Sequence, residues 1–298
     1  MIILLVNMKI VKCIEEFILD QRVKGNSHLT VSYYERSLKL FVGFLGDISV
    51  DELSLLKCKQ FVLYLQNDGS KNSVTIQTYV RGVRAFLSWL YINEYIDFCL
   101  TEKFKLPKAQ SKIKDILTPA EIDILFKSFD ETTFLGIRNS CIVSFMLGSG
   151  CRCCEIVSLK SDSVHIEEGY ALVLGKGNKQ RNVPIGDIAK DKLRLYMSLR
   201  PDSEYFFVQE NGTPITSDTL KDLFRKLKIK TGISRLHAHL LRHTFATMYL
   251  NNGGNIYTLQ TILGHTSLEM VKKYLHIAPY VVVNDFFKYS PIDKKSPG

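Results

Sequence analysis

The chain has 298 residues, of which 46% are hydrophobic and 23% are charged. This composition is typical of a globular protein, the length favours two domains, and no run of 18 apolar residues predicts a membrane-spanning helix. The net charge of +9 is spread along the chain rather than gathered in a tail. It favours a polyanionic partner, most simply nucleic acid, although a merely soluble basic protein is the simpler alternative.

The first hundred residues predict a small bundle of helices. Apolar residues at helical spacing mark a first helix (Val11, Ile14, Ile18) and a second (Tyr34, Leu38, Phe41, Leu45). Ser32 and Glu35 have the spacing of a capping box for the second helix, and Gly46 follows its end. A third helix is expected over residues 56–66, with Phe61, Val62 and Leu65 buried.

A fourth helix is expected to begin near Ser73, with an apolar stripe of Ile76, Val80, Val83, Leu87 and Leu90. Basic side chains lie on or near its polar side: Lys71, Arg81 and Arg84. They form either an ordinary solvated face or a DNA-binding surface. The basic, proline-containing stretch that follows has the composition of a linker. We therefore expect a helical domain over residues 1–102, a linker over 103–116 and a second domain over 117–298.

The second domain opens with a strong helix start, since Thr118 and Glu121 form a capping box around Pro119. An apolar helix over about 135–147 is expected to end at the glycine-containing segment 148–150. Arg152 follows directly, and Glu155 lies one helical turn later. The two residues form either a surface salt bridge or part of an anion-binding site.

Next, two apolar runs at residues 170–174 and 181–185 flank a glycine-rich turn and predict an antiparallel β-hairpin. Lys176 lies in the turn, with Lys179 and Arg181 as further basic candidates for DNA contacts. The turn is not a nucleotide-binding P-loop, because the GxxxxGK[ST] pattern is absent. Helices over about 190–199 and 217–228 complete a fold that is mainly α with one small antiparallel sheet.

The stretch from His237 to Tyr274 contains the highest concentration of candidate catalytic residues. His239 and Arg242 are three positions apart and share one face of a helix that ends at Gly253. A short apolar segment then stops at Gly264 and His265, and the run 266–269 has the form of a capping box before a helix that bears Tyr274. Cationic groups that converge on one tyrosine indicate an anion held beside a phenol nucleophile.

Seven cysteines are present, three of them close together at Cys151, Cys153 and Cys154. The apolar start of the chain is too short for a secretory signal, so we expect reduced thiols and a cytoplasmic protein. A structural zinc site would need a second, spaced pair of ligands, and none accompanies this cluster. We therefore expect buried thiols and no bound metal.

Taken together, these segments resemble the tyrosine recombinases, the lambda-integrase family. Four motifs occur in the family's order: GSGCRCCEIVSL, LGKGNKQRNVPI, HAHLLRHTFAT and LGHTSLEMVKKY. The resemblance implies that Glu155 is the supporting acid of the family. It also implies that six residues occupy the family's catalytic positions: Arg152, Lys176, His239, Arg242, His265 and Tyr274. The sequence departs from the family pattern around Arg152, where cysteines replace the usual apolar and small polar neighbours. It also has Asp97-Phe98-Cys99 after the fourth helix, where Asn-Pro is common. No role is assigned to His237 or His243.

The resemblance implies a helical core-binding domain, an α+β catalytic domain, and site-specific DNA recombination through a 3′-phosphotyrosyl intermediate without ATP, metal or other cofactor. It implies double-stranded DNA with inverted-repeat core sites as the partner, a monomer in free solution and a homotetramer on two duplexes. Without an additional N-terminal domain, the chain looks closest to Xer-like or transposon-type enzymes. A type IB topoisomerase-like activity and a non-catalytic DNA-binding relative are the two alternatives.

The last segment, after Tyr274, is too apolar for a free terminus. Its apolar residues include Val281, Val282, Val283, Phe286 and Phe287. An exposed patch of this kind needs a cover. We expect residues 281–287 to dock on a neighbouring subunit on DNA, with packing on the same chain as the alternative.

Overall fold

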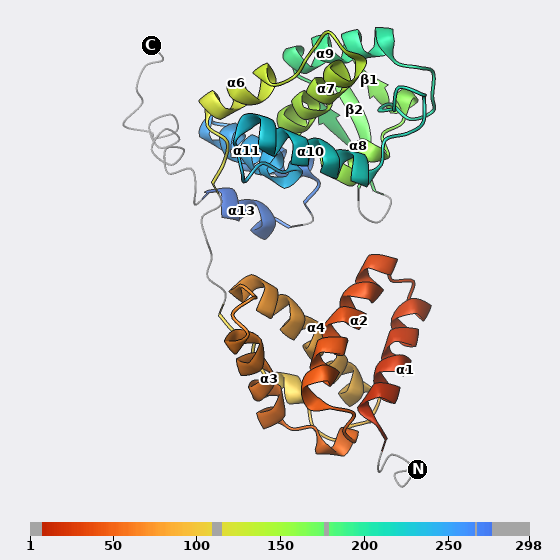
Figure 1. Cartoon of the computed structure of the whole chain (residues 1–298), viewed down its shortest axis with the longest axis vertical. Coiled ribbons are helices and arrows are strands. Elements are labelled where there is room, and N and C mark those ends of the chain that lie inside the picture. The colour runs from red at the N-terminus through yellow and green to blue at the C-terminus, as the bar shows by residue number, and fades with distance from the viewer. Residues whose placement is uncertain (1–7, 109–114, 176–178, 266, 276–298) are drawn as a thin grey trace, which may run out of the picture. The chain divides into compact units, whose positions relative to one another are not determined.

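The computed structural model describes residues 8–108, 115–175, 179–265 and 267–275 (Figure 1). The chain divides into two compact units, Met1–Lys112 and Ile113–Gly298. The hypothesis for residues 281–287 lies outside the described residues, as does Lys176. Within the described residues, no helix is both long and apolar enough to cross a membrane.

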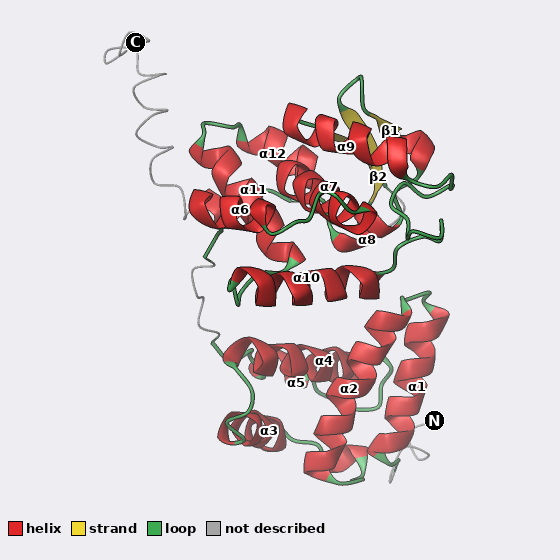
Figure 2. Ribbon diagram, turned by 45° about the horizontal axis from the view of Figure 1, so that its top comes forward, coloured by secondary structure: helices red, strands yellow, loops and turns green. Residues whose placement is uncertain are grey.

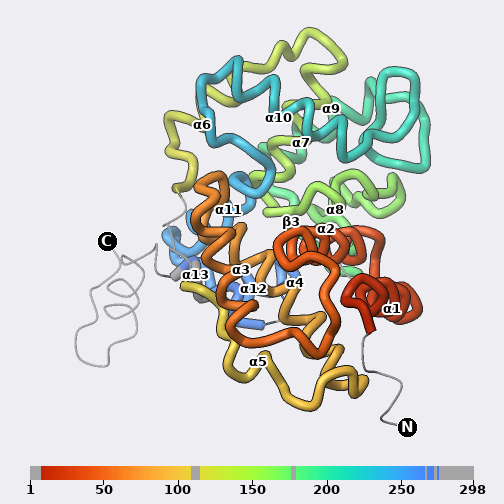
Figure 3. The backbone as a smooth tube through the Cα atoms, turned by 60° about the horizontal axis from the view of Figure 1, so that its bottom comes forward, coloured from red at the N-terminus to blue at the C-terminus, as the bar shows by residue number. Residues whose placement is uncertain are grey.

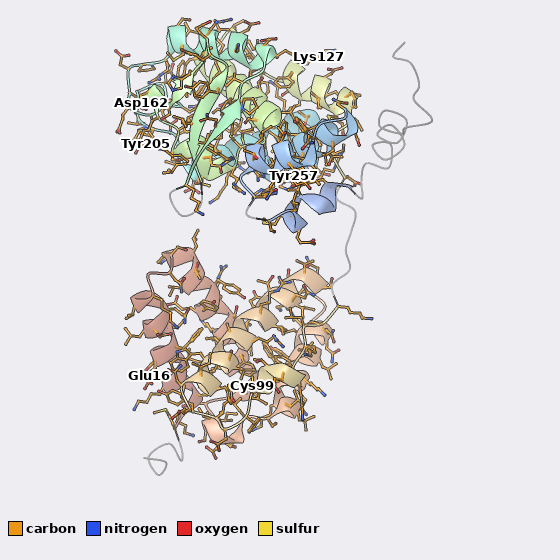
Figure 4. All side chains as sticks on the ribbon, turned by 180° about the vertical axis from the view of Figure 1, so that it is seen from behind. Glu16, Cys99, Lys127, Asp162, Tyr205 and Tyr257 are labelled. Atoms are coloured by element: carbon orange, nitrogen blue, oxygen red, sulfur yellow. The ribbon has the colours of Figure 1, made fainter. Side chains whose placement is uncertain are left out.

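The first unit is helical, as predicted. It contains α1 (Ile10–Val23), α2 (His28–Leu45), a 3-10 turn (Val50–Glu52), α3 (Leu55–Asn67), α4 (Ser73–Ile92) and α5 (Leu100–Lys103). Helices α1 and α2 pack on α4, as Figure 2 shows. The predicted stripe of α4 is confirmed, because each of its five apolar residues is at least 95% buried. Glu16 of α1, labelled in Figure 4, accepts a hydrogen bond from the Tyr95 hydroxyl.

Two predictions for this unit are wrong in part. In the stripe predicted for α1, Ile18 is buried and Ile14 is partly buried, but Val11 is exposed, and the buried face also contains Ile10, Cys13 and Phe17. The face is rotated because the Phe17 ring makes edge contacts with three aromatic rings of α2 and α4, which a stripe of aliphatic residues does not reveal. The N-cap of α2 is Ser27, whose hydroxyl accepts from the Thr30 N–H, so α2 begins a turn earlier than the Ser32 box predicts.

The second unit combines helices with a small sheet. Its helices are α6 (Pro119–Lys127), α7 (Phe134–Ser149), α8 (Cys153–Val157), α9 (Asp187–Leu199), α10 (Ser217–Thr231), α11 (Ala238–Asn251), α12 (Ile256–Leu263) and α13 (Glu269–Leu275). Its strands are β1 (Val164–His165), β2 (Tyr170–Leu174) and β3 (Gln180–Pro184), antiparallel in the order β1-β2-β3. The predicted hairpin is confirmed, with Leu172 opposite Asn182; strand β1 was not predicted.

The core of this unit lies between the sheet and the helices. Helix α7 is buried on most of its surface and runs beside α9 (Figure 3). The predicted capping box at Thr118 and Glu121 starts α6. Tyr205, labelled in Figure 4, forms an isolated bridge with Lys160, whose ammonium lies 3.6 Å from the centre of the Tyr205 ring.

A separate apolar cluster joins the last three helices. Its buried residues come from α11 (Ala246, Leu250), α12 (Leu259, Leu263) and α13 (Val271, Tyr274). Helix α12 ends at Gly264 in the left-handed conformation, as predicted. The predicted capping box at the start of α13 includes Thr266, which lies outside the described residues. This cluster fixes Tyr274 against α11.

Candidate active site

Arg152 is positioned by a tight turn between α7 and α8. Gly150 ends α7 in the left-handed conformation (φ 66°), and a Cβ atom there would lie 2.6 Å from the Phe245 ring. Only glycine fits both the conformation and the space. The turn places Arg152 at the N-cap of α8, where its main-chain N–H donates to Glu155 Oε2 over 2.8 Å.

Glu155 is the buried anion of this site. Its carboxylate accepts four hydrogen bonds, two from Arg152 (N and Nη1) and two from Arg181 (Nη1 and Nη2). The Glu155 side chain is 0% exposed, so the alternative of a surface salt bridge is wrong. Burial raises the pKa of Glu155, but hydrogen bonds from Arg181 and Arg152 outweigh it and hold the pKa below its ordinary value.

Arg181 lies at the centre of a network inside the protein. The sequence groups it with DNA-binding residues, whereas its side chain is only 10% exposed and fully engaged. Besides Glu155, it donates from Nε to the Ile262 carbonyl over 2.7 Å. A Cβ atom on Gly264 would meet Arg181 Cδ at 2.9 Å, so the side chain passes directly over that glycine. Arg181 thus joins β3, α8 and the end of α12.

Arg242 makes a second connection to the end of α12 and also reaches the end of α7. From α11, its Nη1 donates to the Gly150 carbonyl (2.7 Å) and its Nη2 to the Leu263 carbonyl (2.8 Å). The same Nη2 lies 2.8 Å from Nε2 of His265. A guanidinium only donates, so His265 Nε2 accepts and its proton resides on Nδ1. Burial, then repulsion from Arg152, lowers the pKa of Arg242 to about 10.

Tyr274 comes to this group from α13. Its side chain is buried, and its hydroxyl oxygen lies 3.0 Å from Nδ1 of His243. Burial raises the pKa of Tyr274, whereas the positive charges of Arg242 and Arg152 act in the opposite direction. A phenol in this position is protonated at neutral pH and needs an acceptor before it can act as a nucleophile.

An open cleft of about 580 Å³ collects most of the predicted catalytic residues. Its lining residues are Asp115, Arg152, Arg235, His237, His239, Leu240, Arg242, His243, His265, Met270 and Tyr274. His239 is exposed in the first turn of α11. The cleft can hold a phosphodiester between guanidinium groups beside a phenol. Of the six predicted catalytic residues, five are brought together here; Lys176 lies outside the described residues.

The predicted DNA-binding side chains of the first unit already have partners inside the protein. Lys71 pairs with Asp68, Arg81 donates to Gln77 and Arg84 donates to the Thr101 carbonyl. In the second unit, Lys179 is exposed immediately before β3.

The three cysteines of the cluster differ in their exposure to solvent. Cys151 is buried as predicted, Cys153 is half-buried, and Cys154 is exposed, which the prediction of buried thiols missed. In the part of the chain that the structure describes, no group of three or more His, Cys, Asp or Glu side chains is arranged to hold a metal ion.

Sequence reasoning named Arg181 as a DNA-contact candidate but did not predict that it points into the protein, and it assigned no role to His243. A signal existed for each. Arg181 is two positions before the buried Val183, and alternate residues of a strand share one face. His243 is four positions after His239 and therefore lies on the same face of α11.

Two family models match the chain over both units. The phage integrase family matches residues 115–280, and the N-terminal SAM-like domain of phage integrases matches residues 14–93. The chain therefore belongs to the phage integrase family of tyrosine recombinases, and it is a site-specific recombinase that cleaves and rejoins DNA.

Relatives along the full length agree with this assignment. Tyrosine recombinase XerD of Oceanobacillus iheyensis is 29% identical and matches 93% of this chain and 98% of its own length. Tyrosine recombinase XerC of Bacillus pumilus is 30% identical, over 90% of this chain and 92% of its own length. The Tn1549 transposon integrase in complex with circular intermediate DNA has a similar fold, with a TM-score of 0.77 at 21% identity over 94% of this chain and 99% of that one.

Proposed function

We propose that Tyr274 is the nucleophile of the recombinase and forms a 3′-phosphotyrosyl link to one DNA strand. The observation that supports this proposal is the convergence of Arg152, Arg242, His265 and Tyr274 on one cleft. In this scheme the hydroxyl oxygen attacks the scissile phosphorus, and the 5′ oxygen of the next deoxyribose leaves. A second strand with a free 5′-hydroxyl then reverses the step.

Arg152 and Arg242 are proposed to hold the non-bridging phosphate oxygens. Each guanidinium is anchored by the protein, Arg152 on Glu155 and Arg242 on two main-chain carbonyls, so neither has to be ordered when DNA binds. Preorganised donors of this kind act where charge increases in the transition state. Losing one typically costs about 2.7–4 kcal/mol of barrier. Replacing either arginine with lysine keeps the charge but loses the planar fork, so we expect strongly impaired cleavage.

The remaining roles follow from the chemistry of the residues. His265 is proposed to hydrogen-bond the phosphate, and Lys176 is proposed to protonate the leaving oxygen. A histidine of α11 is proposed to accept the phenolic proton, and the sequence analysis favours His239 for this role. Lys176→Ala is then rescued by a substrate whose 5′ bridging oxygen is replaced with sulfur, because a thiolate leaves without a proton. If sulfur gives the alanine variant no advantage, Lys176 is not the general acid.

The partner is proposed to be double-stranded DNA with inverted-repeat core sites, bound by a monomer that assembles into a homotetramer on two duplexes. The helical unit, with Lys71, Arg81 and Arg84, is proposed to act as the core-binding domain, joined by the linker to the catalytic domain with Lys179. Contacts to phosphates predict that affinity falls steeply as salt rises. The activity is proposed to be cytoplasmic.

A nicked suicide substrate tests this function, because cleavage releases a short strand and traps the covalent adduct. A recombinase gives an adduct and then joins an added strand with a 5′-hydroxyl. A topoisomerase-like enzyme relaxes supercoiled plasmid without exchanging strands, and a non-catalytic relative shifts the DNA without an adduct. Only the first result supports the proposal.

A further inference from the structure

We propose that His243 is a catalytic residue that accepts the proton of Tyr274 during attack. The inference rests on the proposed role of Tyr274 as the nucleophile and reassigns the proton acceptor from His239. A general base has to lie within hydrogen-bonding distance of the proton that it removes, about 2.6–3.2 Å between heavy atoms. The 3.0 Å separation between His243 Nδ1 and the Tyr274 hydroxyl meets this condition.

The local structure holds this pair together. Tyr274 is buried among apolar residues of α11, α12 and α13, so its hydroxyl depends on a protein partner rather than on bulk water. His243 follows Arg242 on α11, whose buried side chain is fixed on the Gly150 and Leu263 carbonyls. The backbone that carries His243 is thereby fixed as well. The imidazole is half-buried and lines the cleft next to the phenol.

The tautomer of His243 sets the direction of the proton. With its proton on Nε2, His243 accepts at Nδ1 and the phenol donates, which leaves the lone pairs of the phenolic oxygen available to phosphorus. During attack the O–H bond breaks and the proton moves to Nδ1 as the O–P bond forms. The bond from phosphorus to the 5′ oxygen breaks, and that oxygen takes its proton from the general acid proposed above. The same transfers run backwards when the strand is rejoined.

Other ionisable groups line the same cleft, and any test has to distinguish their effects on the pH dependence from the effect of His243. Among the described residues these are three arginines, three histidines and one carboxylate: Arg152, Arg235, Arg242, His237, His239, His265 and Asp115. Simple packing is the competing explanation for the pair, since the two rings are also in contact with centres 5.6 Å apart.

Two substitutions distinguish a proton-accepting His243 from one that only packs on Tyr274 and from one that only holds its hydroxyl. His243→Phe keeps a ring against Tyr274 but removes Nδ1. His243→Asn places an amide near the Nδ1 position, so it can hold the hydroxyl but cannot take a proton. As a matched control, His165→Asn removes an imidazole stacked on Tyr170 of β2, with ring centres 4.6 Å apart, outside the cleft.

The measurement is the single-turnover rate of adduct formation on a suicide substrate between pH 6 and pH 10, at protein concentrations that saturate the DNA by gel shift. General base catalysis contributes roughly 10²–10⁴-fold, so we expect both His243 variants to be slower by that factor at pH 7. Their rates should then climb with pH across the whole range, because without a base the phenol has to ionise, and burial holds the pKa of Tyr274 above the ordinary value of about 10. The His165 variant should match the wild type.

Three results would overturn the inference. If His243→Phe reacts at the wild-type rate, the contact between His243 and Tyr274 is only packing. If His243→Asn reacts at the wild-type rate, His243 only holds the hydroxyl and does not accept its proton. A changed pH dependence in His239→Asn, with none in His243→Asn, would return the role to His239. Failure of the proposed function itself is visible separately, because Tyr274→Phe would then still form an adduct.

Discussion

Replacing Arg181 with methionine should destabilise the catalytic unit far more than replacing a comparable surface arginine. The substitution keeps an unbranched side chain but removes two hydrogen bonds to Glu155 and one to the Ile262 carbonyl. Glu155 is left buried with Arg152 as its remaining partner in this network. Breaking a buried ion pair on one side costs about 3–5 kcal/mol.

A matched control is available in the same unit. Arg194 also forms a two-pronged pair, with Glu167, but the two side chains are 48% and 73% exposed. Exposed pairs contribute about 0–1 kcal/mol, so Arg194→Met should change stability little. At about 2–4 °C per kcal/mol for a unit of this size, Arg181→Met should lower Tm by roughly 6–20 °C.

Circular dichroism and calorimetry of the full chain provide the assay. The single tryptophan, Trp89, lies in the first unit, so its fluorescence reports that unit and should not change with either substitution. A double variant, Arg181→Met with Glu155→Leu, should lose less stability than the two single changes added together, because no unpaired carboxylate remains. The reasoning is refuted if Arg181→Met costs no more than Arg194→Met.

Two further predictions concern titration and thiol chemistry. Hydrogen bonds from Arg235 lower the pKa of Glu121 to about 2 from an ordinary value of 4.5, so this pair should stabilise the fold above about pH 4.5 and lose its contribution as pH falls toward 2. The gap in unfolding free energy between wild type and Arg235→Met should therefore narrow between pH 5 and pH 2.5, and a constant gap would contradict the pairing. Burial raises the pKa of Cys141, and that of Cys151 to about 12, whereas Cys154 is exposed. Iodoacetamide at neutral pH should modify Cys154 first by mass spectrometry, and equally fast labelling of Cys151 would contradict its burial.

Local signals in the sequence were sufficient to predict helix starts and ends where a residue type has a specific role at a helix terminus. A capping box starts a helix at Thr118, and left-handed glycines end helices at Gly150 and Gly264. The same kind of signal was misleading at the start of α2. Ser32 and Glu35 have the spacing of a capping box, but the N-cap is Ser27, whose hydroxyl accepts from the Thr30 N–H.

The candidate site was predictable in its members but not in their connections. The motifs named Arg152, Arg242 and Tyr274, and these line one cleft. They did not reveal that Arg181 holds Glu155, because that contact joins positions 26 apart through the register of the hairpin. The contact between His243 and Tyr274 likewise depends on how α13 packs on α11, and no local pattern encodes it.

The most direct test of the central claim is the adduct formed by Tyr274→Phe on a nicked suicide substrate. The substitution removes one hydroxyl from a buried ring, so the fold and DNA binding should survive, as circular dichroism and gel shift would report. We predict that wild-type protein forms a covalent protein–DNA band that resists SDS and disappears with protease, and that the phenylalanine variant forms none. An SDS-stable band of unchanged intensity from Tyr274→Phe would contradict the assignment of the nucleophile.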